Sequence, residues 1–145
     1  MVDAKQLKPN DFDKYWQEVC DLYVTALNYL IENHFIVSQS WMPSENMLLP
    51  LMVFLREIKG KILEEEQRRF VEYWFWASLF AQRYSGSSNE VMLEDARILK
   101  GIANREAIND SIYLNQLRSR VTDADDILAY RRKSNNIYKG LLNLV

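Results

Sequence analysis

The stretch that decides the fold is Phe70-Val71-Glu72-Tyr73-Trp74-Phe75-Trp76-Ala77-Ser78-Leu79-Phe80. Its apolar residues fall on nearly every side of a helix, and a helix of that kind has to be surrounded by other elements. Glu64, Glu65 and Glu66 precede it, where the helix dipole favours negative charge. We therefore predict a central aromatic-rich helix over about residues 63–83. The fold class that follows is all-α: a compact bundle of five to six helices around it.

The segments on either side of this stretch supply the other helices. Apolar residues recur at steps of three and four between residues 12 and 30, which predicts an amphipathic helix ending near Glu32. Ser44 can cap a second helix that runs to about Ile58, and Pro50 inside it predicts a kink or a restart. Further helices are predicted over residues 87–103, 111–117 and 137–145, with another segment opening at Thr122.

Length and composition describe one ordinary globular domain. The chain has 145 residues, of which 48% are hydrophobic and 12% are aromatic, so a single domain over residues 1–145 can bury a substantial core. Cys20 is the only cysteine, which excludes an internal disulfide and favours a reducing compartment. The start lacks a signal-peptide pattern, and no apolar run reaches the length of a membrane span. We expect a cytoplasmic protein that makes no membrane contact.

The C-terminal third is more basic than the rest of the chain. Residues 111–145 carry six Lys or Arg against three Asp or Glu, although the net charge of the whole chain is −2. Basic side chains clustered in this way can contact nucleic-acid phosphates. The candidate contacts are Arg118, Arg120, Arg131, Arg132 and Lys133. A solvated helical face would give the same pattern.

The loop after the aromatic stretch is the candidate anion-binding or partner-binding site. An arginine, a tyrosine and three serines precede a helix, and free N–H groups at a helix N-terminus attract anions. The candidate residues are Arg83, Tyr84, Ser85, Ser87 and Ser88. The alternative is structural: Ser87 caps the helix, Gly86 provides the turn, and Arg83 pairs with Glu94 or Asp95.

The sequence contains few of the residue types that catalysis usually requires. His34 is the only histidine, so a zinc site built on Cys and His, a Cys–His pair and a Ser-His-Asp triad all lack their parts. The glycine-rich phosphate-binding patterns are also missing. Paired carboxylates remain, and we expect them on the polar side of a helix and at a helix cap; they are Glu94 with Asp95, and Asp123 with Asp125 and Asp126. The sequence predicts no enzyme activity, no cofactor and no metal.

Two segments carry a family resemblance. They are Trp41-Met42-Pro43-Ser44-Glu45-Asn46-Met47-Leu48-Leu49-Pro50-Leu51 and Tyr73-Trp74-Phe75-Trp76-Ala77-Ser78-Leu79-Phe80-Ala81-Gln82-Arg83-Tyr84-Ser85-Gly86. In combination they resemble the helical region that follows the catalytic part of prokaryotic GmrSD-type restriction proteins, the family of the domain of unknown function 262. Glu94-Asp95 fits the same pattern, and the resemblance runs from about Phe12 to the C-terminus.

The resemblance implies a module without the family's catalytic residues. The family's N-terminal domain is ParB/sulfiredoxin-like, hydrolyses nucleotides and is marked by Asp-Gly-Gln-Gln-Arg, a string that this chain lacks. The family's later nuclease domain depends on histidine, and a chain whose only histidine is His34 cannot contain that domain. We expect a scaffold or interaction module, a piece of a longer anti-phage defence protein, whose partners are the neighbouring catalytic domains. DNA binding is the alternative. Residues 137–145 end the chain in an apolar run and, with part of the first helix, predict a patch that favours a homodimer.

Overall fold

The computed structural model describes residues 8–86, 89–108, 111–118 and 136–144, and within them every regular element is helical. The prediction of an all-α bundle is confirmed. The α-helices are α1 (Pro9–Glu32), α2 (Leu48–Ile58), α3 (Glu65–Phe80), α4 (Asn89–Ala103), α5 (Ser111–Gln116) and α7 (Asn136–Leu144). Two short 3-10 helices, η2 (Gln39–Trp41) and η3 (Glu45–Met47), lead into α2. The predicted segment at Thr122 and the predicted cap at Ser87 lie outside the described residues.

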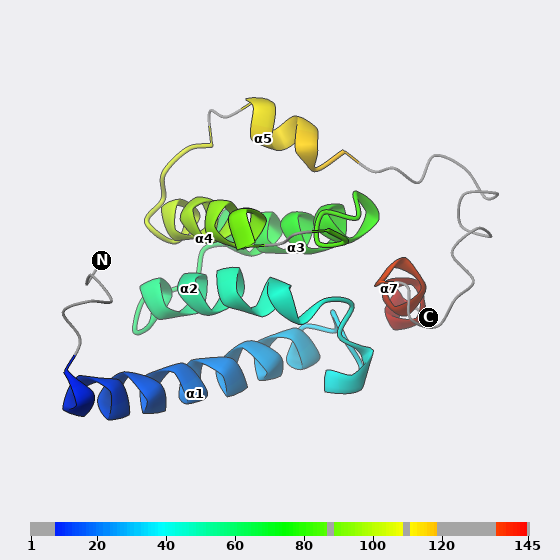
Figure 1. The fold of residues 1–145 in the computed structure, drawn as a ribbon. Coiled ribbons are helices and arrows are strands. Elements are labelled where there is room, and N and C mark those ends of the chain that lie inside the picture. The colour runs from blue at the N-terminus through cyan, green and yellow to red at the C-terminus, as the bar shows by residue number, and fades with distance from the viewer. Residues whose placement is uncertain (1–7, 87–88, 109–110, 119–135, 145) are drawn as a thin grey trace.

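The helices stack in layers, with α2 between the others. Figure 1 shows α1 on one side of α2, a layer of α3 and α4 on the other side, and α5 beyond that layer. The most extensive helix contacts join α2 to α4 and α1 to α2. Six of the eleven residues of α2 are buried, among them Leu51 and Phe54. Because α2 is covered from two sides, its sequence is apolar almost throughout.

The aromatic-rich helix α3 contributes much of the core, but only from one face. Trp74 and Phe75 are fully buried, whereas the side chain of Tyr73 is 47% exposed. Phe35 packs edge-on against Phe75 with ring centroids 5.0 Å apart, and stacks on Trp76 at 6.2 Å. The structure therefore differs from the sequence prediction in one respect, since α2 holds the position flanked on both sides. A tyrosine can remain at the surface of an aromatic run because its hydroxyl is polar.

The helix ends explain two sequence features. The backbone N–H of Lys8 donates to Asp11 Oδ2 at 3.1 Å, so α1 begins at Pro9, three residues before Phe12, where the predicted apolar pattern starts. Pro50 lies in the first turn of α2, directly after η3. A proline costs no hydrogen bond there, because the first N–H groups of a helix have no partner within it. The outcome at Pro50 is a restart.

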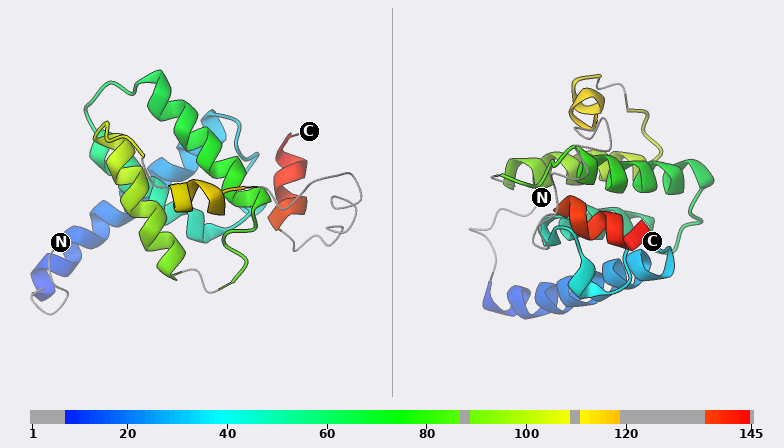
Figure 2. Two further views of the ribbon diagram at one scale, coloured as in Figure 1. Left: turned by 90° about the horizontal axis from the view of Figure 1, so that it is seen from above. Right: turned by 90° about the vertical axis from the view of Figure 1, so that its right-hand side faces the viewer.

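The last helix, α7, packs across the end of the bundle. It contacts α3 and η2 (Figure 2). A Cβ atom added at Gly140 would collide with the side chain of Leu79, so glycine is what lets α7 approach α3 closely. Asn143 bonds α7 to the segment between α1 and α2. Its Oδ1 accepts from the backbone N–H of Val37, and its Nδ2 donates to the carbonyl of Trp41. Ile137 is buried while Leu144 is 57% exposed, so only part of the predicted apolar patch remains open.

No helix among the described residues has both the length and the apolar content to cross a membrane.

Candidate functional site

The most elaborate polar arrangement of the described chain is a buried group of side chains around Asp95, here called the Asp95 cluster. It brings together α3, the loop that follows it, α4 and α5. The members are Trp74, Arg83, Tyr84, Glu94, Asp95, Tyr113 and Gln116. Asp95 is at the centre and has an exposed fraction of 0%. It shares the buried stripe of α4 with Leu99 and Ala103.

Several donors compensate the buried carboxylate of Asp95. The indole Nε1–H of Trp74 donates to Oδ2 at 3.0 Å. Arg83 forms a two-pronged contact, in which Nε lies 3.0 Å and Nη2 lies 2.9 Å from Oδ1. The hydroxyl of Tyr84 also donates to Oδ2. A buried carboxylate is tolerated only when its charge is paired and its lone pairs are used, and both conditions hold here.

The backbone turn after α3 places Arg83 in this position. Gln82 adopts a left-handed conformation with φ of 53°. The N–H of Arg83 bonds back to the carbonyl of Ser78 at 2.9 Å, and the N–H of Gln82 bonds to the carbonyl of Leu79 at 3.0 Å. These two bonds form a Schellman motif, which reverses the chain at the end of a helix. The left-handed residue is thus Gln82, and the prediction that Gly86 provides this turn is wrong.

Arg83 connects the cluster to α5. Its Nη1 donates to Gln116 Oε1 at 2.6 Å, and its Nη2 pairs with Glu94 Oε2. Its guanidinium carbon lies 5.1 Å from the centroid of the Tyr113 ring, within the range of a cation–π contact. The Arg83 side chain is only 5% exposed. One arginine therefore ties the α3–α4 loop, α4 and α5 together.

The Asp95 cluster raises the pKa values of Arg83, Tyr84 and Tyr113. Burial lowers the pKa of the Arg83 guanidinium, but the hydrogen bonds and charges of Asp95 and Glu94 outweigh burial, so this pKa is raised. Burial, reinforced by the charge and hydrogen bonding of Asp95, raises the pKa of Tyr84 and of Tyr113 well above their ordinary values. Arg83 stays charged and both tyrosines stay neutral at physiological pH.

The structure divides the predicted anion-binding residues. Arg83 and Tyr84 point into the Asp95 cluster, and Arg83 pairs with both carboxylates that the alternative interpretation named. Ser85 is exposed, and its hydroxyl donates to the carbonyl of Gln82 at 2.7 Å. The remaining two, Ser87 and Ser88, lie outside the described residues. A guanidinium held by two carboxylates attracts an anion weakly, because its charge is already neutralised.

Asp95 is the residue whose position the sequence analysis missed. The prediction that it lies on the polar side of its helix is wrong, because its side chain is fully buried. Its spacing was the available signal: Asp95 precedes Leu99 by four residues and Ala103 by eight, and that spacing puts all three on one face of a helix.

The basic residues and the single histidine form no site within the described chain. Arg118 is exposed just after α5, and the other candidate nucleic-acid contacts, Arg120, Arg131, Arg132 and Lys133, lie outside the described residues. His34 is exposed at the end of α1, in a left-handed conformation with φ of 63°. Among the residues that the structure covers, no three His, Cys, Asp or Glu side chains lie close enough to hold a metal ion.

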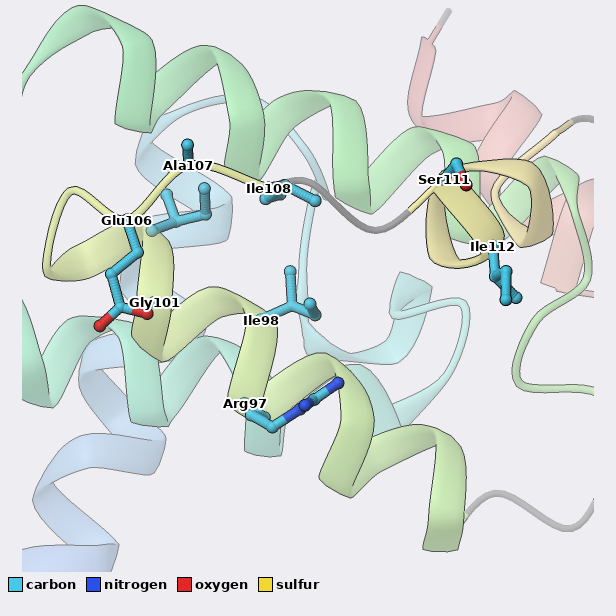
Figure 3. Close-up of a pocket in the computed structure, with 9 residues that line it drawn as sticks. Arg97, Ile98, Gly101, Glu106, Ala107, Ile108, Ser111 and Ile112 are labelled. Carbon is cyan, nitrogen blue, oxygen red and sulfur yellow. The ribbon is translucent and has the colours of Figure 1, made fainter.

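A wide trough lies beside the cluster, between α4 and the segment that leads to α5. Its volume is about 660 Å³. Figure 3 shows Ile98 on α4 and Ile108 and Ile112 on the opposite side, with Arg97 and Glu106 among the lining residues. Ile112 is 71% exposed, so the trough is an open surface. None of its lining residues belongs to the Asp95 cluster.

Comparison with known proteins finds a distant relative of uncharacterized function. No family model matches the chain. An uncharacterized protein of Methanocaldococcus jannaschii is 24% identical over 141 residues, and the alignment covers 92% of this chain but 23% of that protein. The chain therefore spans less than a quarter of the length of this relative. No solved structure matches.

Proposed function

We propose that this chain is a non-catalytic helical scaffold or interaction module of a longer, restriction-like anti-phage protein, in which it supports or connects neighbouring catalytic domains. The observation that carries this proposal is the internal pairing of the Asp95 cluster. Asp95 is fully buried and Arg83 is 5% exposed, and each contacts other members of the cluster.

The Asp95 cluster has the properties of a structural junction. A catalytic acid or base must reach the proton of a bound substrate, whereas Asp95 is closed off from solvent and accepts hydrogen bonds from Trp74, Arg83 and Tyr84. The cluster joins three helices at one point. Rigid geometry of this kind suits a module that has to hold other domains in place.

Two further arguments support a role within a longer protein. The relative from Methanocaldococcus jannaschii is matched over 23% of its length, so a region similar to this chain occurs there beside much additional sequence. The resemblance of residues 41–51 and 73–86 to GmrSD-type proteins supplies the restriction context. Under this proposal the partners are the catalytic domains of the same polypeptide.

The first test is the gene. We expect its complete reading frame to encode an Asp-Gly-Gln-Gln-Arg segment upstream of this region. A reading frame without that segment would remove the restriction context.

The second test is biochemical. The purified chain should neither hydrolyse nucleotides nor cleave DNA above the background of an Asp95→Asn variant, with divalent metal present. Turnover that Asp95→Asn abolishes while the fold persists by circular dichroism would overturn the scaffold role. Binding of duplex or single-stranded DNA that weakens steeply with salt would instead favour the nucleic-acid alternative, and Arg118→Ala is the variant that probes it within the described chain.

A further inference from the structure

The N-terminal half of α1 carries an exposed apolar face that nothing in the described bundle covers. Its members are Phe12, Tyr15, Trp16 and Val19, with exposed fractions of 59%, 39%, 58% and 44%. We call them the α1 aromatic face. Their spacing of three, four and seven residues from Phe12 places them on one side of the helix. Contiguous exposed aromatic surface of this kind marks an interaction site.

This face continues the stripe by which α1 joins the bundle. Ala26 and Leu30 extend the same three-and-four spacing, and their exposed fractions are 0% and 1%. The C-terminal part of the stripe is therefore covered, while α1 extends beyond the other helices at its N-terminal end (Figure 2). An element that covers the α1 aromatic face would lengthen the core of the bundle by the same kind of packing, and a helix is the element that fits such a stripe.

The exposed rings are already ordered for binding. Phe12 and Trp16 stack one helical turn apart, with ring centroids separated by 5.9 Å and planes inclined by 11°. Fixing two rings before the partner arrives lowers the entropy lost on association. Tryptophan and tyrosine are also the side chains that most often dominate the energy of an interface.

The charges around the α1 aromatic face define the partner. Asp11 and Asp13 flank Phe12 on its two sides, since neighbouring residues of a helix lie about 100° apart. Lys14 lies on a different side of α1, where it lines a groove toward α2. Lys8 lies one helical turn before Phe12, so its positive charge is at the N-terminal end of the face. The carboxylates of Asp11 and Asp13 lie beside the rings. A second copy of this chain packed in parallel would bring acidic flanks together, which is unfavourable.

We propose that the α1 aromatic face binds an amphipathic helix of a partner polypeptide, whose apolar stripe is flanked by lysine or arginine. This proposal rests on the interaction role proposed above and names the chemistry of the partner. Apolar burial supplies the affinity, and the basic flanks that face Asp11 and Asp13 select the partner and its orientation.

The test uses two synthetic helical peptides as probes. Both carry leucines at the same three-and-four spacing; one has lysine flanks and the other has glutamate flanks. Binding of each labelled peptide to the chain is followed by fluorescence anisotropy. We expect the lysine peptide to bind at least about ten-fold more tightly, and Trp16→Ala to weaken it by about ten-fold. Val24→Ala is the matched control, because Val24 is 56% exposed outside this face and should leave the Kd unchanged. Asp13→Lys should narrow the preference between the peptides.

Each other outcome rejects the proposal. Equal binding of the two peptides, or binding that Trp16→Ala leaves unchanged, would show that the α1 aromatic face does not select this partner. Sedimentation that reveals a dimer abolished by Trp16→Ala would assign the face to a second copy. These failures are separable from failure of the scaffold role, which is decided by the reading frame and by the absence of turnover.

Discussion

Trp74 and Trp16 lie in the same small bundle but meet solvent in opposite ways. Trp74 is 0% exposed and donates its indole N–H to Asp95, whereas Trp16 is 58% exposed and stacks on Phe12. The region around Trp74 pairs its polar groups internally. The region around Trp16 leaves apolar rings exposed to solvent, and an exposed ring contributes no burial free energy to folding.

This difference separates the part of the molecule that holds the fold from the part that is available for contact. The Asp95 cluster joins α3, α4 and α5 through buried contacts, so its loss must affect global stability. The N-terminal half of α1 has few buried neighbours, and such segments open at low cost in free energy. Substitutions in the two regions should therefore differ in size and in kind.

The largest difference is expected between the two tryptophans. Trp74→Ala removes a buried ring and leaves a cavity beside Asp95, so the free energy of unfolding should fall by about 3–5 kcal/mol. Trp16→Ala should lower it by less than about 0.5 kcal/mol, because the ring is exposed. Urea unfolding followed by circular dichroism measures both. Similar losses from the two substitutions would contradict the division between the regions.

A smaller effect is expected at Gln67, which links α3 to α4. Its Oε1 accepts from the N–H of Glu64 at 3.0 Å, and its Nε2 donates to the carbonyls of Ile102 and Ala103 at 2.9 and 3.1 Å. Gln67→Ala removes the cap of α3 and leaves these groups without their partner. The free energy of unfolding should fall by about 1–2 kcal/mol. Arg69→Ala is the control, since Arg69 is exposed and its i,i+4 pair with Glu65 contributes little.

The Asp95 cluster should also make stability fall in alkali. Burial, followed by the charge and hydrogen bond of Asp95, raises the pKa of Tyr84 above its ordinary value of about 10. Above that pH the unfolded chain loses the proton and the folded chain keeps it. The folded state then binds more protons, so the free energy of unfolding falls as pH rises, by up to about 1.4 kcal/mol per pH unit for this tyrosine.

Comparison with a Tyr84→Phe variant isolates this contribution. Urea unfolding between about pH 9 and pH 11 should give a shallower decline for the variant than for the native chain, since tyrosine ionisation begins near pH 10. Parallel declines would show that Tyr84 ionises equally well in the folded chain. That result would contradict its role as a buried donor to Asp95.

The smallest effect is expected at Ser78. Its side chain is 1% exposed, and its hydroxyl has no hydrogen-bond partner among the described residues. Ser78→Ala removes a buried polar group that gains nothing from the protein, so the free energy of unfolding should stay within about 1 kcal/mol and shift toward greater stability. A clear destabilisation measured by urea unfolding would show that the hydroxyl has a bonding role.

Much of the fold was predictable because helix signals are local. The C-terminal end of α1, the restart at Pro50 and the glutamates at the start of α3 follow from spacing, proline geometry and the helix dipole. The exposed side of α3 was not predictable in this way. Tyr73 and Trp74 are adjacent aromatic residues, and only the tertiary arrangement decides which one is buried.

The site was predicted in part. The pairing of Arg83 with Glu94 or Asp95 was one of two alternatives, and the structure has both contacts. The participation of Trp74 and Tyr113 was missed, because each is distant from Asp95 in the sequence and both read as ordinary apolar core. A buried carboxylate on an apolar helix stripe, as at Asp95 before Leu99, is the sequence signal that points to such a cluster.

The most direct test of the account is a double-mutant cycle between Arg83 and Asp95, using Arg83→Met, Asp95→Asn and the double variant. Free energies of unfolding in urea give the coupling between the two side chains. A structural junction predicts that each single substitution destabilises the chain and that the coupling is favourable by about 2–3 kcal/mol. A coupling near zero, or an Asp95→Asn chain more stable than the native one, would contradict it and mark Asp95 as a residue kept for function at the expense of stability.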